Sequence, residues 1–190
     1  MGDRLMTFVD GSNLLQGTGT VIQANLRSDK PTDDALRLAG MIVRELHRRL
    51  GTEAFCYGFQ HIRSYWFGSF VGNVEYEQSL RSMLRTLGFE PVIFKQKKGK
   101  EKRVDLAVAR EMLIHAFGRN YDLALLVAGD EDYVDLVGDL KRLGVRVMGS
   151  FYQTGLSSDL RISFDYFHRL DIWGAQREEL VGKLGGKLPR

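Results

Sequence analysis

Short apolar runs alternate with amphipathic stretches along this chain, in the order typical of repeated strand–helix units. Strands are expected at residues 5–9, 89–94, 123–127 and 145–148. Helices are expected at residues 31–50, 73–87, 104–117 and 133–143, where apolar positions recur every three or four residues. Residues 157–170 are expected to form a short helix and a last extended segment. The pattern predicts an α/β fold with a mostly parallel central sheet.

Some segments carry more specific expectations. Residues 123–127 are wholly apolar, which is typical of a central strand that is covered on both faces. Residues 54–71 are rich in aromatic and β-forming residues but too long for one strand, so we expect a bend at Gly58 or Gly68. The helix at residues 104–117 is expected to turn these side chains inward: Leu106, Ala109, Leu113 and Phe117.

The length of 190 residues is usual for one domain. We expect that domain over residues 1–173, followed by a charged, glycine-containing tail over residues 174–190. The single cysteine, Cys56, excludes an internal disulfide framework and a multi-cysteine zinc cluster, and it is typical of a cytoplasmic protein. The apolar runs are too short to span a bilayer, so no membrane partner is expected.

Positive charge is concentrated in one segment between the strand at residues 89–94 and the next helix. The formal net charge of +3 is too small to indicate a partner, but this segment crowds basic residues together against one acid, Glu101. Such a local field suits a phosphate backbone, although a solvated surface loop remains an alternative. The residues expected to bind RNA phosphates are Lys97, Lys98, Lys100, Lys102 and Arg103.

Acidic residues follow two of the expected strands directly. Asp10 ends the first strand, and Asp130 follows the strand at residues 123–127, with Asp132 two positions later. Ligands of a parallel sheet bind at the carboxyl ends of its strands, so these acids would meet if the two strands are neighbours. Asp105, which opens a helix, could face the same edge. Taken singly, an acid such as Asp105 or Asp132 is more often only a helix cap, so it is the combination of acids that favours a site.

Carboxylates that are brought together repel one another unless protons or a cation neutralise them. Oxygen ligands suit Mg²⁺ or Mn²⁺, and the absence of a histidine–cysteine cluster in the sequence argues against zinc. Such ions activate water and stabilise the oxygens of an in-line phosphoryl displacement. Hydrolysis of phosphodiester bonds is therefore the expected chemistry.

Several motifs together resemble the NYN domain, a branch of the PIN-like nuclease superfamily that includes the LabA-like proteins. They are Val9-Asp10-Gly11-Ser12-Asn13-Leu14, Lys102-Arg103-Val104-Asp105 and Val127-Ala128-Gly129-Asp130-Glu131-Asp132-Tyr133. The resemblance continues through Gly144-Val145-Arg146-Val147, Ser157-Ser158-Asp159-Leu160 and Asp165-Tyr166-Phe167, and it covers residues 4–171.

The resemblance implies a PIN-like, Rossmann-like three-layer sandwich with a Mg²⁺ or Mn²⁺ site and metal-dependent endoribonuclease activity. Carried onto this sequence, the catalytic and metal-binding acids would be Asp10, Asp105, Asp130 and Asp132, with Asn13 as a polar partner. Ser12 or Asn13 could also cap a helix that begins at Leu14.

This sequence departs from the family pattern at two places. Many relatives carry a second aspartate six positions after the one that matches Asp105, and Glu111 stands there. Six residues later on a helix, Glu111 would lie about 120° around the helix axis from Asp105, so the two acids would not share one metal ion. Glu111 is therefore expected to support the site indirectly or to form a salt bridge. Ala128 and Gly129 stand where relatives usually have serine or threonine.

Other functions stay open at this point. The chain could bind RNA as a regulatory protein without cleaving it, or act as a phosphatase with Asp10 as nucleophile; the latter fits less well because Ser12 replaces the usual second aspartate. Arg63, Tyr65, Trp66 and Phe67 could form a platform on which unpaired bases stack, but the three aromatic residues are expected to pack in the core instead. A homodimer contact around Trp66 and Phe70 remains an option.

Overall fold

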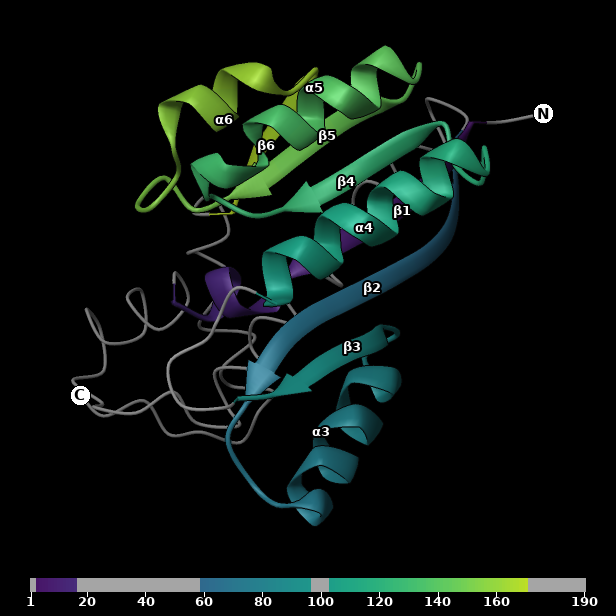
Figure 1. Cartoon of the computed structure of the whole chain (residues 1–190). Coiled ribbons are helices and arrows are strands. Elements are labelled where there is room, and N and C mark those ends of the chain that lie inside the picture. The colour runs from purple at the N-terminus through teal and green to yellow at the C-terminus, as the bar shows by residue number, and fades with distance from the viewer. Residues whose placement is uncertain (1–2, 17–58, 97–102, 171–190) are drawn as a thin grey trace.

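A single parallel sheet organises the chain, as seen in the computed structural model, which describes residues 3–16, 59–96 and 103–170 (Figure 1). Within these described ranges the sheet has six strands, in the order β3-β2-β1-β4-β5-β6. Their bounds are β1 Arg4–Asp10, β2 Gln60–Phe70, β3 Glu90–Lys95, β4 Leu123–Val127, β5 Arg146–Phe151 and β6 Tyr166–Arg169. The α/β fold with a parallel central sheet is confirmed, and β4 is central as expected.

Helices cover both faces of this sheet. On one face, α3 (Val74–Thr86) packs against Val9 and Trp66 through an apolar cluster that includes Leu80 and Leu84. On the other face lie α4 (Arg103–Phe117), α5 (Val134–Arg142) and α6 (Ser158–Ser163), which share a second cluster with Phe8 and Phe67. A short 3₁₀ turn, η1 (Glu131–Tyr133), joins β4 to α5. The result is three layers, with the sheet in the middle (Figure 1).

The strand β2 is longer than expected. It runs unbroken for 11 residues, and Gly68 pairs with Ile93 of β3 in regular register, so the expectation of a bend at Gly68 is wrong. The irregularity lies near the start of the strand, where the register with β1 shifts between Leu5 and Met6. Gly58, the other candidate, lies outside the described residues.

The prediction for the inward face of α4 is confirmed for Ala109 and Leu113, which are half-buried and pack against the core, and is wrong for Leu106 and Phe117. The buried residues of α4 are Val104, Val108, Met112 and Ala116, whereas Leu106 and Phe117 are 71% and 70% exposed. Apolar residues occur on nearly every side of this helix, so periodicity alone does not select the inward face. The residues that pack on the sheet recur at every fourth position and are two valines, a methionine and an alanine.

The aromatic residues of β2 belong to the core. Tyr65, Trp66 and Phe67 are at most 5% exposed, which confirms that they pack inside the protein rather than stack on bases. Phe70 is also buried, so neither Trp66 nor Phe70 offers its own side chain to a partner, and a homodimer contact of the surface around them stays a prediction. In the described ranges, no helix has the length and apolar character needed to cross a membrane.

Some expectations concern residues outside the described ranges. These are the helix at residues 31–50, the tail at residues 174–190, and four of the five residues expected to bind RNA: Lys97, Lys98, Lys100 and Lys102. Arg103 is described, as the first residue of α4.

Candidate carboxylate site

The strands β1 and β4 lie side by side, and their carboxyl ends bring two predicted acids to one edge of the sheet. Val9 is the register partner of Val127, so Asp10 and the segment leading to Asp130 leave the sheet at the same level. The like charge of Asp130 is close enough to raise the pKa of Asp10. The structure therefore places Asp10 and Asp130 together, as the strand order requires.

Asp10 is both a helix cap and a buried acid. Residues 11–16 are helical, and the Asp10 Oδ1 atom accepts a 3.0 Å hydrogen bond from the backbone amide of Asn13. The cap is therefore Asp10, and the expectation that Ser12 or Asn13 caps this helix is wrong. Asp10 is only 2% exposed, so its carboxylate is held in a fixed position facing the helix α4 side of the sheet.

Tyr133 connects Asp10 to Asp105. Its hydroxyl oxygen lies 2.7 Å from Asp10 Oδ2 and 3.3 Å from Asp105 Oδ1, and the residue is 2% exposed. Asp105 lies in the first turn of α4, which brings it to the same edge as Asp10. Sequence reasoning did not single out Tyr133, although a buried tyrosine next to an acidic motif usually needs a polar partner for its hydroxyl.

The electrostatics of this cluster disfavour a charged Asp10 in the protein alone. Burial raises the pKa of Asp10 to about 6, and the charges of Asp105 and Asp130 add to the rise. The hydrogen bonds from the Asn13 amide and the Tyr133 hydroxyl act in the opposite direction but are outweighed. Burial, followed by the charge of Asp10, raises the pKa of Tyr133 as well, so its hydroxyl stays neutral.

The charges around Asp10 differ from those around other acids of the chain. Asp3, Asp122, Asp139 and Asp165 each form an ion pair with an arginine or a lysine. Asp10 is the one charged side chain in the buried set of described residues, and it makes no ion pair with any of them. A positive charge supplied from outside the chain would therefore stabilise its ionised form.

Ser12 and Asn13 lie in the helical segment that directly follows Asp10 and fasten it to both neighbouring strands. Asn13 Oδ1 accepts a 2.8 Å hydrogen bond from the backbone amide of Gly129, just after β4. On the other side, Ser12 Oγ accepts a 3.3 Å hydrogen bond from the amide of Ser69 in β2. Ser12 and Asn13 thus hold the segment after Asp10 in place, because their side chains accept hydrogen bonds from backbone amides of the neighbouring segments.

The glycines that flank the two acids allow close packing. A Cβ atom on Gly11 would lie 2.1 Å from the indole nitrogen of Trp66, and one on Gly129 would lie 2.4 Å from the ring of Phe151. The Gly129 carbonyl also accepts a hydrogen bond from the amide of Ser157. The glycine that replaces the usual serine or threonine at position 129 therefore has a steric reason in this chain.

Asp132 is more exposed than the other predicted acids. It lies in η1 with an exposed side chain, while its backbone amide donates a 3.2 Å hydrogen bond to Asp130 Oδ1, the cap of that turn. Within the described ranges, no three side chains of Asp, Glu, His or Cys come close enough together to hold a metal ion by themselves. The cluster therefore offers fewer protein ligands than the four acids predicted from sequence.

The donor set nonetheless fits Mg²⁺ or Mn²⁺ better than other ions. Mg²⁺ is usually held by one or two carboxylates, with water and substrate phosphate completing its shell. Asp10 and Asp105 share one hydroxyl, so these two carboxylates match that number, and Asp130 is near enough to raise the pKa of Asp10. All of these groups supply hard oxygen atoms.

Glu111 belongs to a separate network on α4. Its carboxylate lies 3.3 Å from Nε2 of His115, one helical turn later, and that nitrogen is also 3.0 Å from the hydroxyl of Tyr65. Of the two roles expected for Glu111, the structure shows the salt bridge, formed when His115 is protonated. No contact of Glu111 with Asp10 or Asp105 is found among the described residues.

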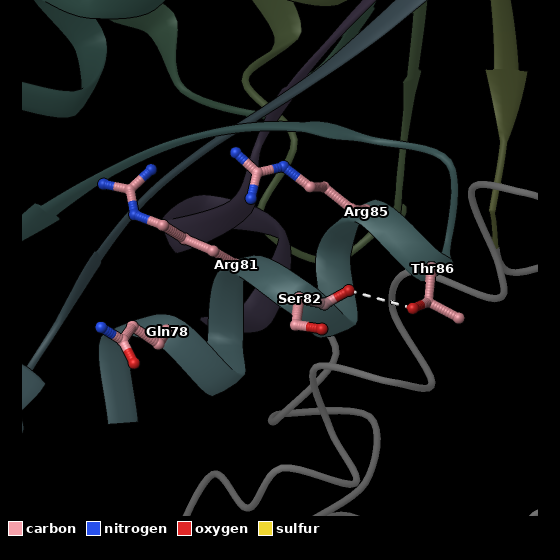
Figure 2. A pocket seen from close by; sticks show the side chains of 5 residues that line it. All are labelled: Gln78, Arg81, Ser82, Arg85 and Thr86. Carbon is pink, nitrogen blue, oxygen red and sulfur yellow. Dashed lines mark hydrogen bonds between the residues drawn. The ribbon is translucent and has the colours of Figure 1, made fainter. Parts of the chain in front are cut away.

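A second polar surface lies on α3, on the opposite face of the sheet from α4. Figure 2 shows a shallow, solvent-open depression lined by Gln78, Arg81, Ser82, Arg85 and Thr86. Arg81 donates hydrogen bonds of 3.2 and 3.3 Å to the carbonyls of Pro91 and Ile93 in the edge strand β3. Arg81 is thus engaged in holding the edge strand, and the depression contains none of the predicted site residues.

Comparison with known proteins identifies the class to which this fold and acid cluster belong. The NYN domain family model matches residues 4–171, so the chain belongs to the NYN domain family, which is nuclease-like. A comparison with curated proteins found no match.

Solved structures support the fold. A protein of unknown function from Vibrio parahaemolyticus has a similar structure, with a TM-score of 0.59 and 16% identity over 88% of this chain and 93% of that chain. A short-chain dehydrogenase/reductase from Serratia marcescens matches with 13% identity over 96% of this chain and 69% of that chain. Its TM-score of 0.30 is too low to indicate a shared fold. At these identities the likeness shows the fold alone.

Proposed function

We propose that this protein is an endoribonuclease that uses Mg²⁺ or Mn²⁺ to hydrolyse phosphodiester bonds in single-stranded or structured RNA. The observation that carries the proposal is the buried Asp10, which lies next to Asp105 and Asp130 and lacks an ion-pair partner among the described residues. Membership of a nuclease-like family favours hydrolysis of phosphodiester bonds as the reaction.

The residues at the carboxyl ends of β1 and β4 would have two roles, to bind the cation and to hold the acids in position. Asp10, Asp105 and Asp130 would hold the cation, and Asp132, exposed beside them, would complete the acidic rim. When bound, such a cation activates water and neutralises the charge that develops on the phosphate. Asn13 and Ser12 keep the segment after Asp10 fixed to β4 and β2, so that the acids do not move apart during the reaction.

The positive end of α4 would hold the RNA backbone. Arg103 is exposed, its guanidinium lies 5.6 Å from the ring centre of Phe94, and it occupies the same helical turn as Asp105. A phosphate bound there would lie near the acids. We assign Lys97, Lys98, Lys100 and Lys102, which precede Arg103 in the chain, to the same task.

A second candidate is an RNA-binding regulatory protein that keeps the fold but does not cleave. The observation in its favour is that the described residues form no group of three metal-ligating side chains. Asp10, Asp105 and Asp130 are nonetheless all present at the edge, and capping a helix accounts for Asp10 but not for the two further acids beside it. The nuclease proposal therefore accounts for more of the structure.

The test is cleavage of a labelled RNA that contains both paired and unpaired regions. Purified protein would be compared in Mn²⁺, in Mg²⁺ and in EDTA, beside Asp130→Asn purified in the same way to reveal contaminating nucleases. Asp139→Asn is the matched control, because Asp139 is an exposed acid on α5 that pairs with Arg142 away from the site. Metal-dependent cleavage that is lost only in Asp130→Asn supports the proposal. RNA binding without cleavage in either metal favours the regulatory protein.

A further inference from the structure

Tyr133 places a neutral hydroxyl between two carboxylates of the proposed site. Its oxygen lies 2.7 Å from Asp10 Oδ2 and 3.3 Å from Asp105 Oδ1, and its single proton can be donated to only one of them at a time. The ring is 2% exposed and packs in the apolar cluster below α4 and α5, so the hydroxyl is held where it is.

The same two oxygens are the ones that a cation shared by Asp10 and Asp105 would use. The Tyr133 hydroxyl donates its proton to Asp10 Oδ2, 2.7 Å away, so a cation that approached this oxygen from the same side would meet that proton and be repelled by it. We propose that the Tyr133 hydroxyl and a divalent cation compete for Asp10 Oδ2 and Asp105 Oδ1, so that cation binding displaces the hydroxyl. This inference rests on the proposed function, because it requires a cation at these acids.

Displacement of the hydroxyl would also move other acids. Tyr133 is the last residue of η1, the turn that is capped by Asp130 and contains Asp132. Since the buried ring has little free space, its hydroxyl leaves the two carboxylates only if this turn shifts. Tyr133 is therefore a positioning residue that couples occupation of the site to the placement of Asp130 and Asp132.

The test compares Mn²⁺ affinity in wild type and Tyr133→Phe, measured from the electron paramagnetic resonance signal of free Mn²⁺ after removal of bound metal. Loss of a hydrogen bond to a charged group predicts that Tyr133→Phe binds Mn²⁺ more tightly, by on the order of tenfold. Tyr121→Phe is the matched control, because Tyr121 is equally buried and donates to the Met112 carbonyl on α4 without touching the acids. Its Mn²⁺ affinity should equal that of wild type.

The phenylalanine variant keeps the buried ring, and its melting temperature in EDTA shows whether it is folded. Unchanged or weaker Mn²⁺ binding by folded Tyr133→Phe overturns the inference. If wild-type binding is then abolished by Asp10→Asn, the cation site of the proposed function stands without the competition. If neither wild type nor Tyr133→Phe binds Mn²⁺, both the competition and the proposed cation site are overturned.

Discussion

The side-chain oxygen of Asn13 accepts a 2.8 Å hydrogen bond from the backbone amide of Gly129, a residue 116 positions away in the chain. This bond ties the segment after Asp10 to the loop of Asp130. Since Gly129 is buried, its amide has no water to replace the lost acceptor if Asn13 is removed.

Asn13→Ala is therefore expected to reduce the free energy of unfolding by about 1–3 kcal/mol. Cleavage of RNA should fall on the order of 10- to 100-fold, because the acids are no longer held at a fixed separation. Urea unfolding and single-turnover cleavage measure the two effects. Ser12→Ala, which removes the longer bond to Ser69, is the control and should change both quantities much less. Equal effects of the two variants would contradict a special role for Asn13.

The stability of the metal-free protein should depend on pH through Asp10. Burial raises its pKa to about 6 in the folded protein, from an ordinary value of 3.8. The folded state binds this proton more tightly than the unfolded chain, so the group favours folding below pH 4, and that contribution is lost as the pH rises through 6.

Asp10→Asn removes this dependence. In EDTA, the free energy of unfolding of the variant should gain roughly 2 kcal/mol on that of wild type between pH 4 and pH 7. Urea unfolding at a series of pH values measures the difference, and Asp139→Asn, which alters an exposed acid, serves as control. Parallel pH profiles for wild type and Asp10→Asn would show that the pKa of Asp10 is not raised in the folded protein.

Gly129 should not tolerate a side chain. A Cβ atom there would lie 2.4 Å from the ring of Phe151 and 2.6 Å from the carbonyl oxygen of Gly155. Gly129→Ala is expected to lower the free energy of unfolding by about 1–3 kcal/mol and to reduce RNA cleavage, since Asp130 is the next residue. Gly138→Ala is the matched control.

Gly138 lies in α5, and a Cβ atom there would meet nothing within 4 Å. Because alanine favours a helix over glycine, Gly138→Ala should raise the free energy of unfolding by up to about 1 kcal/mol. Thermal or urea unfolding of the two variants gives opposite signs if the packing at Gly129 is as described. A stabilising effect of Gly129→Ala would contradict it.

Arg81 is expected to protect the edge of the sheet. It covers the carbonyls of Pro91 and Ile93, which point away from β2 on the edge strand β3. Arg81→Ala exposes these acceptors to pairing with another chain, so light scattering should detect more self-association on mild heating. Arg85→Ala, which changes the neighbouring arginine in the same depression (Figure 2), should leave association unchanged. The same association in both variants would contradict this role.

The fold was predictable because its strands differ clearly from their surroundings. The runs that became β1 and β4 are almost wholly apolar and end at an acid or a glycine, so their type and their shared edge followed from sequence. The inward face of α4 was predictable only in part, because Leu106 and Phe117 are as apolar as the residues that pack on the sheet. Only the position of the helix above β1 and β2 decides between them.

The candidate site was predictable in part for a similar reason. Asp10 and Asp130 follow neighbouring strands, so strand order alone brings them together. Asp132 was expected beside them, but the 3₁₀ turn of η1 leaves its side chain exposed. Tyr133 could not be assigned, because its contact with Asp10 joins residues that are 123 positions apart and depends on how η1 folds over the sheet.

The most direct test of the central claim is the single-turnover rate of RNA cleavage in Mn²⁺ by wild type, Asp10→Asn and Asp105→Asn. Asp105 is the acid that the structure joins to Asp10 through one hydroxyl, although the two lie on different elements of the fold. We expect cleavage by wild type, and a cleavage rate that is lower by on the order of 100-fold or more in both folded variants. Cleavage at the wild-type rate by either variant would contradict the claim.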